Sequence, residues 1–108
     1  MQLQVKAVHF ELGEQQRQHI DRRVQRFTYA REYLVDLALT LTRERSLFHA
    51  EASLHFRWGA TTHLKVSGYD LIEAFDKLFD KIQAKVAKEK DRITQVSHGD
   101  PHRAAARG

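Results

Sequence analysis

Apolar and polar residues alternate in four segments of this chain, at residues 2–8, 35–43, 47–57 and 61–69. A repeat of two residues places the apolar side chains on one face of a β-strand and the polar side chains on the other. The third segment shows the pattern most clearly, because its apolar positions are Phe48, Ala50, Ala52, Leu54 and Phe56. The chain is therefore predicted to form four strands, each with one face in a core.

Two other segments repeat their apolar residues at the spacing of an α-helix. The first begins after Gly13 and runs to about Tyr29, with an inner side made of Gln16, Ile20, Val24 and Phe27. The second begins after Asp70, which is suited to cap the helix, with Glu73 three residues later as in a capping box. Its apolar side consists of Leu71, Phe75, Leu78, Ile82, Val86 and Ile93.

These elements follow one another in the order β-α-β-β-β-α. The order predicts an α+β fold, a two-layer sandwich with a four-stranded sheet and both helices on one face. The other face of the sheet is polar and is expected to lie in solvent. Opposed residues of antiparallel strands share a face. Leu41 is therefore expected to oppose Phe48 across a two- or four-residue turn around Arg43–Ser46. Leu54 is expected to oppose Leu64 across an odd loop at residues 58–60.

One domain is expected over residues 1–93, because a chain of 108 residues can form one core. After Ile93 the sequence TQVSHGDPHRAAARG has no apolar repeat, so residues 94–108 are expected to form a flexible tail. The chain shows neither a signal peptide nor a transmembrane segment, and a cytoplasmic location is the default expectation. Since it has no cysteine, disulfides, Cys-zinc sites and thiol catalysis are excluded.

Positively charged residues line one side of the last predicted helix. Steps of four, four, three and four residues stack them along one face, and they are Lys77, Lys81, Lys85, Lys88 and Arg92. Like charges at this spacing cost about 0.2–0.5 kcal/mol per pair, so an anionic partner such as phosphate would compensate them. A solvated helix face is the alternative.

The whole chain is moderately basic, with a net charge of +4. Three arginines of the first helix are expected to point outward, namely Arg22, Arg23 and Arg26.

Catalytic motifs are missing from the sequence. It contains no glycine-rich phosphate loop, no nucleophile elbow and no His-Glu metalloprotease motif, so no enzymatic activity and no cofactor are expected. Asp76 and Asp80 lie one helical turn apart, where surface ion pairs with Lys77 and Lys81 are the expected role. The seven histidines raise the question of a metal site.

Two of these histidines are candidate metal ligands. If Arg57 opposes Thr61, then His55 and His63 face each other on the polar side of the sheet. A zinc or copper site needs a third and usually a fourth ligand, and only Glu51 lies near. We therefore expect no metal site and interpret the two histidines as part of a polar surface.

The strongest sequence signal is a family resemblance that extends from Met1 to Ile93. The opening MQLQVKAVHFEL and the segment LVDLALTLTRE are similar to the first two strands of the ribosome hibernation promoting factors, the ribosome-associated translation inhibitors. The most specific part is the segment GYDLIEAFDKLFDKIQAKVAKEKDRI. It carries the family pattern at Gly68, Asp70, Ala74, Asp76, Leu78, Asp80 and Lys81, followed by lysines near the helix end.

This resemblance implies a function. Members of the family bind the small ribosomal subunit between its head and body, cover the decoding region where mRNA and tRNA would lie, and block translation in idle ribosomes. The expected rRNA-binding residues are Lys81, Lys85, Lys88, Lys90, Arg92, Arg22, Arg23 and Arg26. The chain is expected to be a short form of the family, without the second dimerising domain, and a monomer when free. Glu89 and Asp91 depart from the more uniformly basic helix end of close relatives.

Two other functions are compatible with the pattern. A double-stranded RNA-binding module has the same α-β-β-β-α order, but its lysines stand at the start of the last helix, where this chain has Asp70, Glu73 and Asp76. A protein-interaction scaffold would instead use the exposed polar sheet face, with Thr40 and Glu51 among its contact residues. In that case the lysines of the last helix would not matter.

Overall fold

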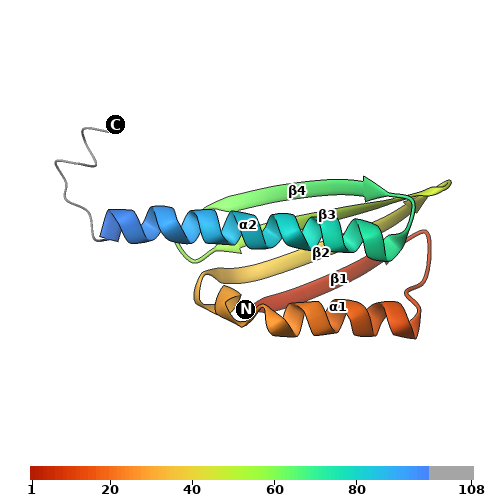
Figure 1. Cartoon of the computed structure of the whole chain (residues 1–108), viewed down its shortest axis with the longest axis horizontal. Helices are drawn as coiled ribbons and strands as arrows, with labels where there is room; N and C mark the ends of the chain where they lie inside the picture. Colours follow the sequence, from red (N-terminus) through yellow and green to blue (C-terminus); the bar gives the residue numbers. More distant parts are fainter. Residues whose placement is uncertain (98–108) are drawn as a thin grey trace.

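The computed structural model describes the backbone of residues 1–97 and the side chains of residues 1–27 and 30–92. It has two layers, a four-stranded sheet and two helices that cover one of its faces (Figure 1). The strands are β1 (Gln2–Val8), β2 (Leu34–Glu44), β3 (Leu47–Phe56) and β4 (Thr61–Gly68). The helices are α1 (Glu14–Arg26), the short 3-10 helix η1 (Thr28–Glu32) and α2 (Leu71–Ser97). The predicted α+β class and element order are confirmed.

The sheet is mixed and keeps the order of the sequence, β1-β2-β3-β4. Strand β1 runs parallel to β2, and the chain returns between them through α1. Parallel neighbours need such a crossover, whereas β2, β3 and β4 follow one another as antiparallel hairpins. All four strands begin and end within one residue of the predicted segments, because the alternation of side chains marks them clearly.

The predicted strand registers were wrong, although the predicted faces were right. Leu41 opposes Ala50 instead of Phe48, and Phe48 opposes Arg43 across a two-residue turn at Arg45 and Ser46. In the second hairpin, Leu54 opposes Thr62 instead of Leu64. Parity excludes only odd shifts, so a change by two positions leaves every side chain on its predicted face.

The helices differ from the prediction at their ends. Helix α1 stops at Arg26 instead of Tyr29, and η1 then leads into β2. Helix α2 continues past Ile93 to Ser97. Its start agrees with the prediction, because the Glu73 backbone N–H donates to Oδ2 of Asp70 at 3.1 Å. The rest of the expected tail, residues 98–108, lies outside the described residues.

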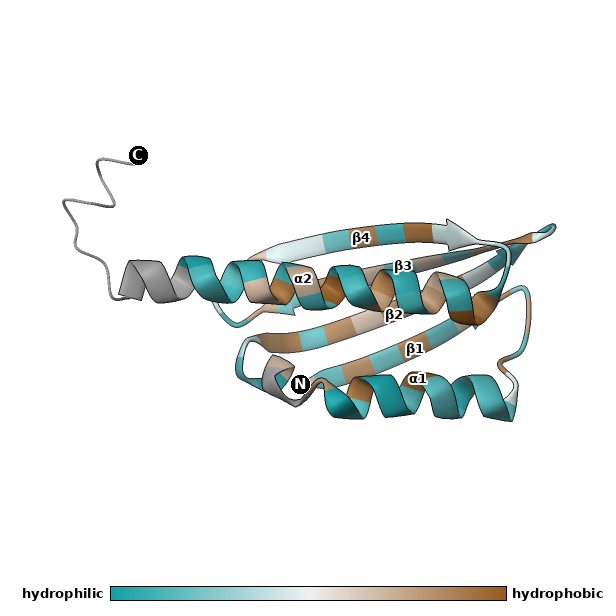
Figure 2. Ribbon diagram, viewed as in Figure 1, coloured by the Kyte–Doolittle hydropathy of each residue, from teal (hydrophilic) through white to brown (hydrophobic). Residues whose placement is uncertain are grey.

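The core lies between the sheet and the two helices and is formed mainly by β2, β3 and α2. Helix α2 contributes Leu71, Ala74, Phe75, Leu78, Phe79, Ile82 and Val86, all of them buried. Helix α1 buries only Ile20 completely, and the colouring of Figure 2 shows it as an almost wholly hydrophilic helix. Among the residues described, no helix is long and apolar enough to span a membrane.

Candidate nucleic-acid interface

The basic stripe of α2 lies on the flank of the helix that points away from α1. At about 100° per residue, Lys81, Lys85, Lys88 and Arg92 fall within about 60° of one another. Gln83, which lies about 160° from Lys81 around the axis, faces α1 and accepts a hydrogen bond from Arg23. Because α2 packs over β3 and β4, the stripe lies on the side of the edge strand β4.

Two lysines of this stripe are exposed and available to a partner. Lys81 and Lys88 are exposed, and neither forms an ion pair with any described residue. No carboxylate within the described part of the chain therefore pairs with their charges. Lys77, one turn before Lys81, forms an ion pair with Glu73 at 3.1 Å and is less available.

The other two members of the stripe share a carboxylate of the same helix. Glu89 is only 7% exposed, and its Oε1 accepts a hydrogen bond from Nη2 of Arg92 at 3.0 Å. The Lys85 ammonium lies 3.9 Å from Oε2 of the same carboxylate and is half-buried. Glu89, which looked like an interruption of the basic helix end, therefore holds two of the predicted phosphate ligands in place.

Replacing this carboxylate gives a test of its structural role. In the Glu89→Gln variant, the free energy of unfolding is expected to fall by about 1–2 kcal/mol, because a buried charge-assisted hydrogen bond is lost. The Asp91→Asn control removes an exposed carboxylate of the same helix and is expected to stay within about 0.5 kcal/mol of wild type. Urea unfolding measures both values. An equal effect of the two substitutions would contradict a structural role for Glu89.

Lys90 lies on a different side of α2 from the stripe. It follows Lys81 by nine residues, which places it about 180° around the helix. It is exposed and shares the side of Gln83, the side that faces α1. The crest between Lys90 and the stripe carries Asp80, Ala84, Ala87 and Asp91, all exposed. The predicted cations of α2 therefore form two groups separated by an acidic crest.

Arg23 does not point outward as predicted. Its side chain is 27% exposed, and Nη1 lies 3.2 Å from Oδ1 of Asp76 while Nη2 lies 3.1 Å from Oδ1 of Asp80. The guanidinium also lies over the ring of Phe79, 4.9 Å from its centroid. The predicted outward orientation of Arg23 was wrong. The apolar repeat of α1 identifies only the side of the helix that packs on the sheet, and it does not identify the side that contacts α2.

The two aspartates of α2 also differ from their predicted role. Instead of pairing with Lys77 and Lys81, they face α1. Asp76 accepts from Arg23 and also lies 2.8 Å from Nε2 of His19, whose ring meets Phe75 edge-on. The sequence did contain a signal for this contact, because His19 and Arg23 are spaced four residues apart, as are Asp76 and Asp80.

The remaining arginines of α1 are Arg22 and Arg26. Both are exposed, lie one turn apart, and have no ion-pair partner within the described part of the chain. They lie beside the line of contact between α1 and α2, which is called the seam below, on the same side as Lys90. Of the eight predicted rRNA-binding residues, five are therefore exposed and have no ion-pair partner among the described residues. They form two groups: Lys81 and Lys88 on the far flank of α2, and Arg22, Arg26 and Lys90 near the contact between the helices.

The polar face of the sheet does not bring His55 and His63 opposite each other. In the observed register His63 opposes Ser53 and bonds to its hydroxyl at 2.8 Å, while His55 opposes Thr61. Nδ1 of His55 lies 3.5 Å from Oδ2 of Asp36. The described residues contain no group of three or more His, Cys, Asp or Glu side chains that could hold a metal ion.

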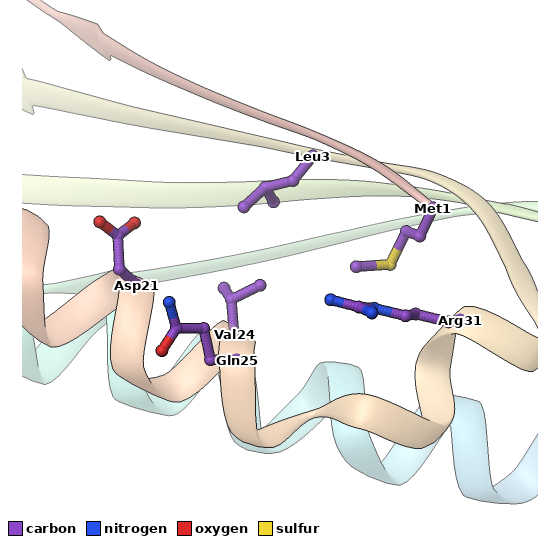
Figure 3. A pocket seen from close by; sticks show the side chains of 6 residues that line it. All are labelled: Met1, Leu3, Asp21, Val24, Gln25 and Arg31. Atoms are coloured by element: carbon purple, nitrogen blue, oxygen red, sulfur yellow. The ribbon is translucent and has the colours of Figure 1, made fainter.

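Two pockets in the described part of the chain lie apart from the lysine stripe. One, of about 410 Å³, lies between β1, α1 and η1. It is lined by Met1, Leu3, Asp21, Val24, Gln25 and Arg31, and the Arg31 side chain extends beneath Met1 toward Val24 (Figure 3). Another, of about 470 Å³, lies at the start of the seam and includes His19 and Arg22. Neither has the arrangement of nucleophile, base and anion-binding groups that a catalytic site requires.

Comparison with known proteins identifies the family. The family model described as sigma 54 modulation protein / S30EA ribosomal protein matches residues 3–94, which is most of the chain. The chain belongs to this family. The family resemblance drawn from the sequence is thus confirmed, and membership indicates a ribosome-associated factor that regulates translation. No curated protein matches the sequence significantly.

Two solved structures have a similar fold. A ribosomal subunit interface protein from Coxiella burnetii has a TM-score of 0.75 at 15% identity, over 84% of this chain and 99% of that one. The N-terminal domain of protein Y from Thermus thermophilus has a TM-score of 0.68 at 16% identity, over 82% of this chain and 98% of that one. At these identities the likeness concerns the fold.

Proposed function

We propose that this protein inhibits translation without catalysis, by binding the small ribosomal subunit and occupying the channel where mRNA and tRNA would lie. The observation that carries the proposal is the exposed pair Lys81 and Lys88 on α2, whose charges have no partner among the described residues. Arg22 and Arg26 of α1 and Lys90 supply the second group of cations. The partner is rRNA, and the site of action is the cytoplasm.

The mechanism is steric occlusion. Phosphate contacts from lysine and arginine supply most of the affinity and fix the orientation, but they carry no sequence information. Specificity therefore comes from the shape of the rRNA channel and from the rigid spacing of the two groups of cations. The Coxiella burnetii protein of similar fold is described as a ribosomal subunit interface protein, which supports this location.

The acidic crest of α2 favours folded rRNA over a simple duplex. A regular RNA duplex presents a continuous row of phosphates, whereas Asp80 and Asp91 stand between the two groups of cations. A phosphate backbone that crossed the crest would meet these carboxylates and be repelled. RNA that contacts both flanks must therefore pass on either side of the crest, as the walls of a channel do.

Co-sedimentation with purified small subunits at about 50 and about 200 mM salt tests the proposal, because these concentrations bracket the range in which phosphate contacts lose affinity steeply. We expect binding at the lower salt, much weaker binding at the higher salt, and inhibition of in vitro translation by the same preparation. A short RNA duplex added as competitor is expected to have little effect. Absence of binding at low salt, or efficient competition by the duplex, would contradict the proposed function.

A further inference from the structure

The contact between the two helices is a built hydrogen-bond network in the middle of the proposed RNA-binding surface. His19 and Arg23 lie one turn apart on α1, and Asp76 and Asp80 lie one turn apart on α2. Arg23 joins both carboxylates, and His19 joins the first of them at 2.8 Å. These four residues are called the clamp below. The helices run in the same direction, so each turn of α1 meets one turn of α2 (Figure 1).

Few other contacts fix the orientation of α1. Ile20 is its only fully buried residue within the described chain, and Val24 is only partly buried. A helix of 13 residues is marginal in isolation and depends on tertiary packing. The clamp supplies charge-assisted hydrogen bonds and places the Arg23 guanidinium over the ring of Phe79, which anchors α1 to the buried side of α2.

The clamp also determines where the exposed arginines of α1 lie. Arg22 directly precedes Arg23, and Arg26 follows it by three residues, so both move with the backbone that Arg23 holds. If α1 rotated or slid along α2, these arginines would change their distance from Lys81 and Lys88. The spacing between the two groups of cations therefore depends on the carboxylates of Asp76 and Asp80. Considered by their charge alone, these carboxylates would weaken the binding of RNA.

We propose that the clamp residues His19, Arg23, Asp76 and Asp80 are positioning residues for RNA binding, and that Arg23 itself does not contact phosphate. The inference rests on the proposed function. It predicts an effect opposite in sign to simple electrostatics. Removing two carboxylates from a surface that binds an anion should strengthen binding, unless those carboxylates hold the cations in place.

The test compares two kinds of carboxylate on one helix. The Asp76→Asn/Asp80→Asn variant is expected to bind small subunits about tenfold more weakly than wild type, equivalent to the loss of one charge-assisted contact. The slope of log affinity against log salt should flatten by about one, because about one phosphate contact of Arg22 and Arg26 is lost when α1 is no longer held in place. The Asp91→Asn control also removes a negative charge from α2, but from a residue outside the clamp, and is expected to bind as tightly as wild type or more tightly.

Several outcomes separate the possibilities. Binding by Asp76→Asn/Asp80→Asn as tight as that of Asp91→Asn would overturn the positioning role and leave the proposed function intact. Failure of the wild-type protein to bind would overturn both. Circular dichroism checks the fold, and Arg23→Lys provides a second variant because it keeps the charge but loses the forked geometry. Weaker binding by Arg23→Lys supports the clamp, whereas binding equal to wild type contradicts it.

Discussion

Reversing the charges of Lys81 and Lys88 to glutamate is expected to weaken binding to the small ribosomal subunit about a hundredfold at low salt, since each lost charge-assisted contact costs about a factor of ten. Both residues are exposed and unpaired among the described residues, so the fold should be retained. The slope of the salt dependence should also flatten by about two, one for each phosphate contact. Co-sedimentation over a range of salt concentrations measures both quantities.

The matched control is Lys6→Glu/Lys65→Glu on the opposite face of the sheet. It makes the same change in net charge with residues that are also exposed, but on the polar side that no helix covers. We expect its binding to stay close to that of wild type. If the control lost affinity and Lys81→Glu/Lys88→Glu did not, the interface would be the sheet face, and the proposed role of α2 would be wrong.

The choice of Lys81 and Lys88 comes from the structure and not from the sequence. The periodicity of α2 grouped Lys81, Lys85, Lys88 and Arg92 as equivalents, which they are in position around the helix axis. Their availability differs, because Glu89 occupies two of them. Helical spacing shows which side chains share a face, but whether an acidic neighbour is buried beside them depends on tertiary packing.

Arg23 illustrates a similar limit. A helix that covers a sheet has one apolar side, and the repeat of Ile20, Val24 and Phe27 identified it. The second contact of α1, with α2, consists of polar and charged residues, and an apolar repeat cannot reveal it. The contact between α1 and α2 was indicated by the matching four-residue spacing of His19 with Arg23 and of Asp76 with Asp80. This spacing is specific only when the two helices are already known to be neighbours.

Strand prediction succeeded for the faces and failed for the registers for one physical reason. Side chains alternate with a period of two, so alternation identifies the inner residues of each strand but does not distinguish registers that differ by two. The turns decide between them. Arg45 has a φ of 58°, in the left-handed region that tight hairpin turns use. Glycine or asparagine commonly marks such a position in a sequence, but here the residue is an arginine. The absence of an opposed His55–His63 pair follows from the corresponding shift in the second hairpin.

Phe79 is expected to be among the most important residues for stability. It is completely buried, meets Phe27 edge-on with ring centroids 5.3 Å apart, and lies 5.5 Å from Phe75. The Phe79→Ala variant should lose about 3–5 kcal/mol of the free energy of unfolding, because both the buried surface and the ring contacts disappear and a cavity remains. In urea unfolding, the midpoint is expected to fall by about 2 M.

The Phe79→Leu control keeps an apolar side chain at this position. Its loss of free energy of unfolding is expected to be less than about half that of Phe79→Ala, since the leucine leaves a smaller cavity.

Phe79 also supports the Arg23 guanidinium. For that reason the effects of Phe79→Ala and Arg23→Gln on stability should not add, and the double variant should lose at least about 0.5 kcal/mol less than the sum. Additive losses would mean that the core and the clamp are independent. Coupled losses would show that the core of α2 also holds α1, and hence Arg22 and Arg26, in the orientation that the proposed RNA contact requires.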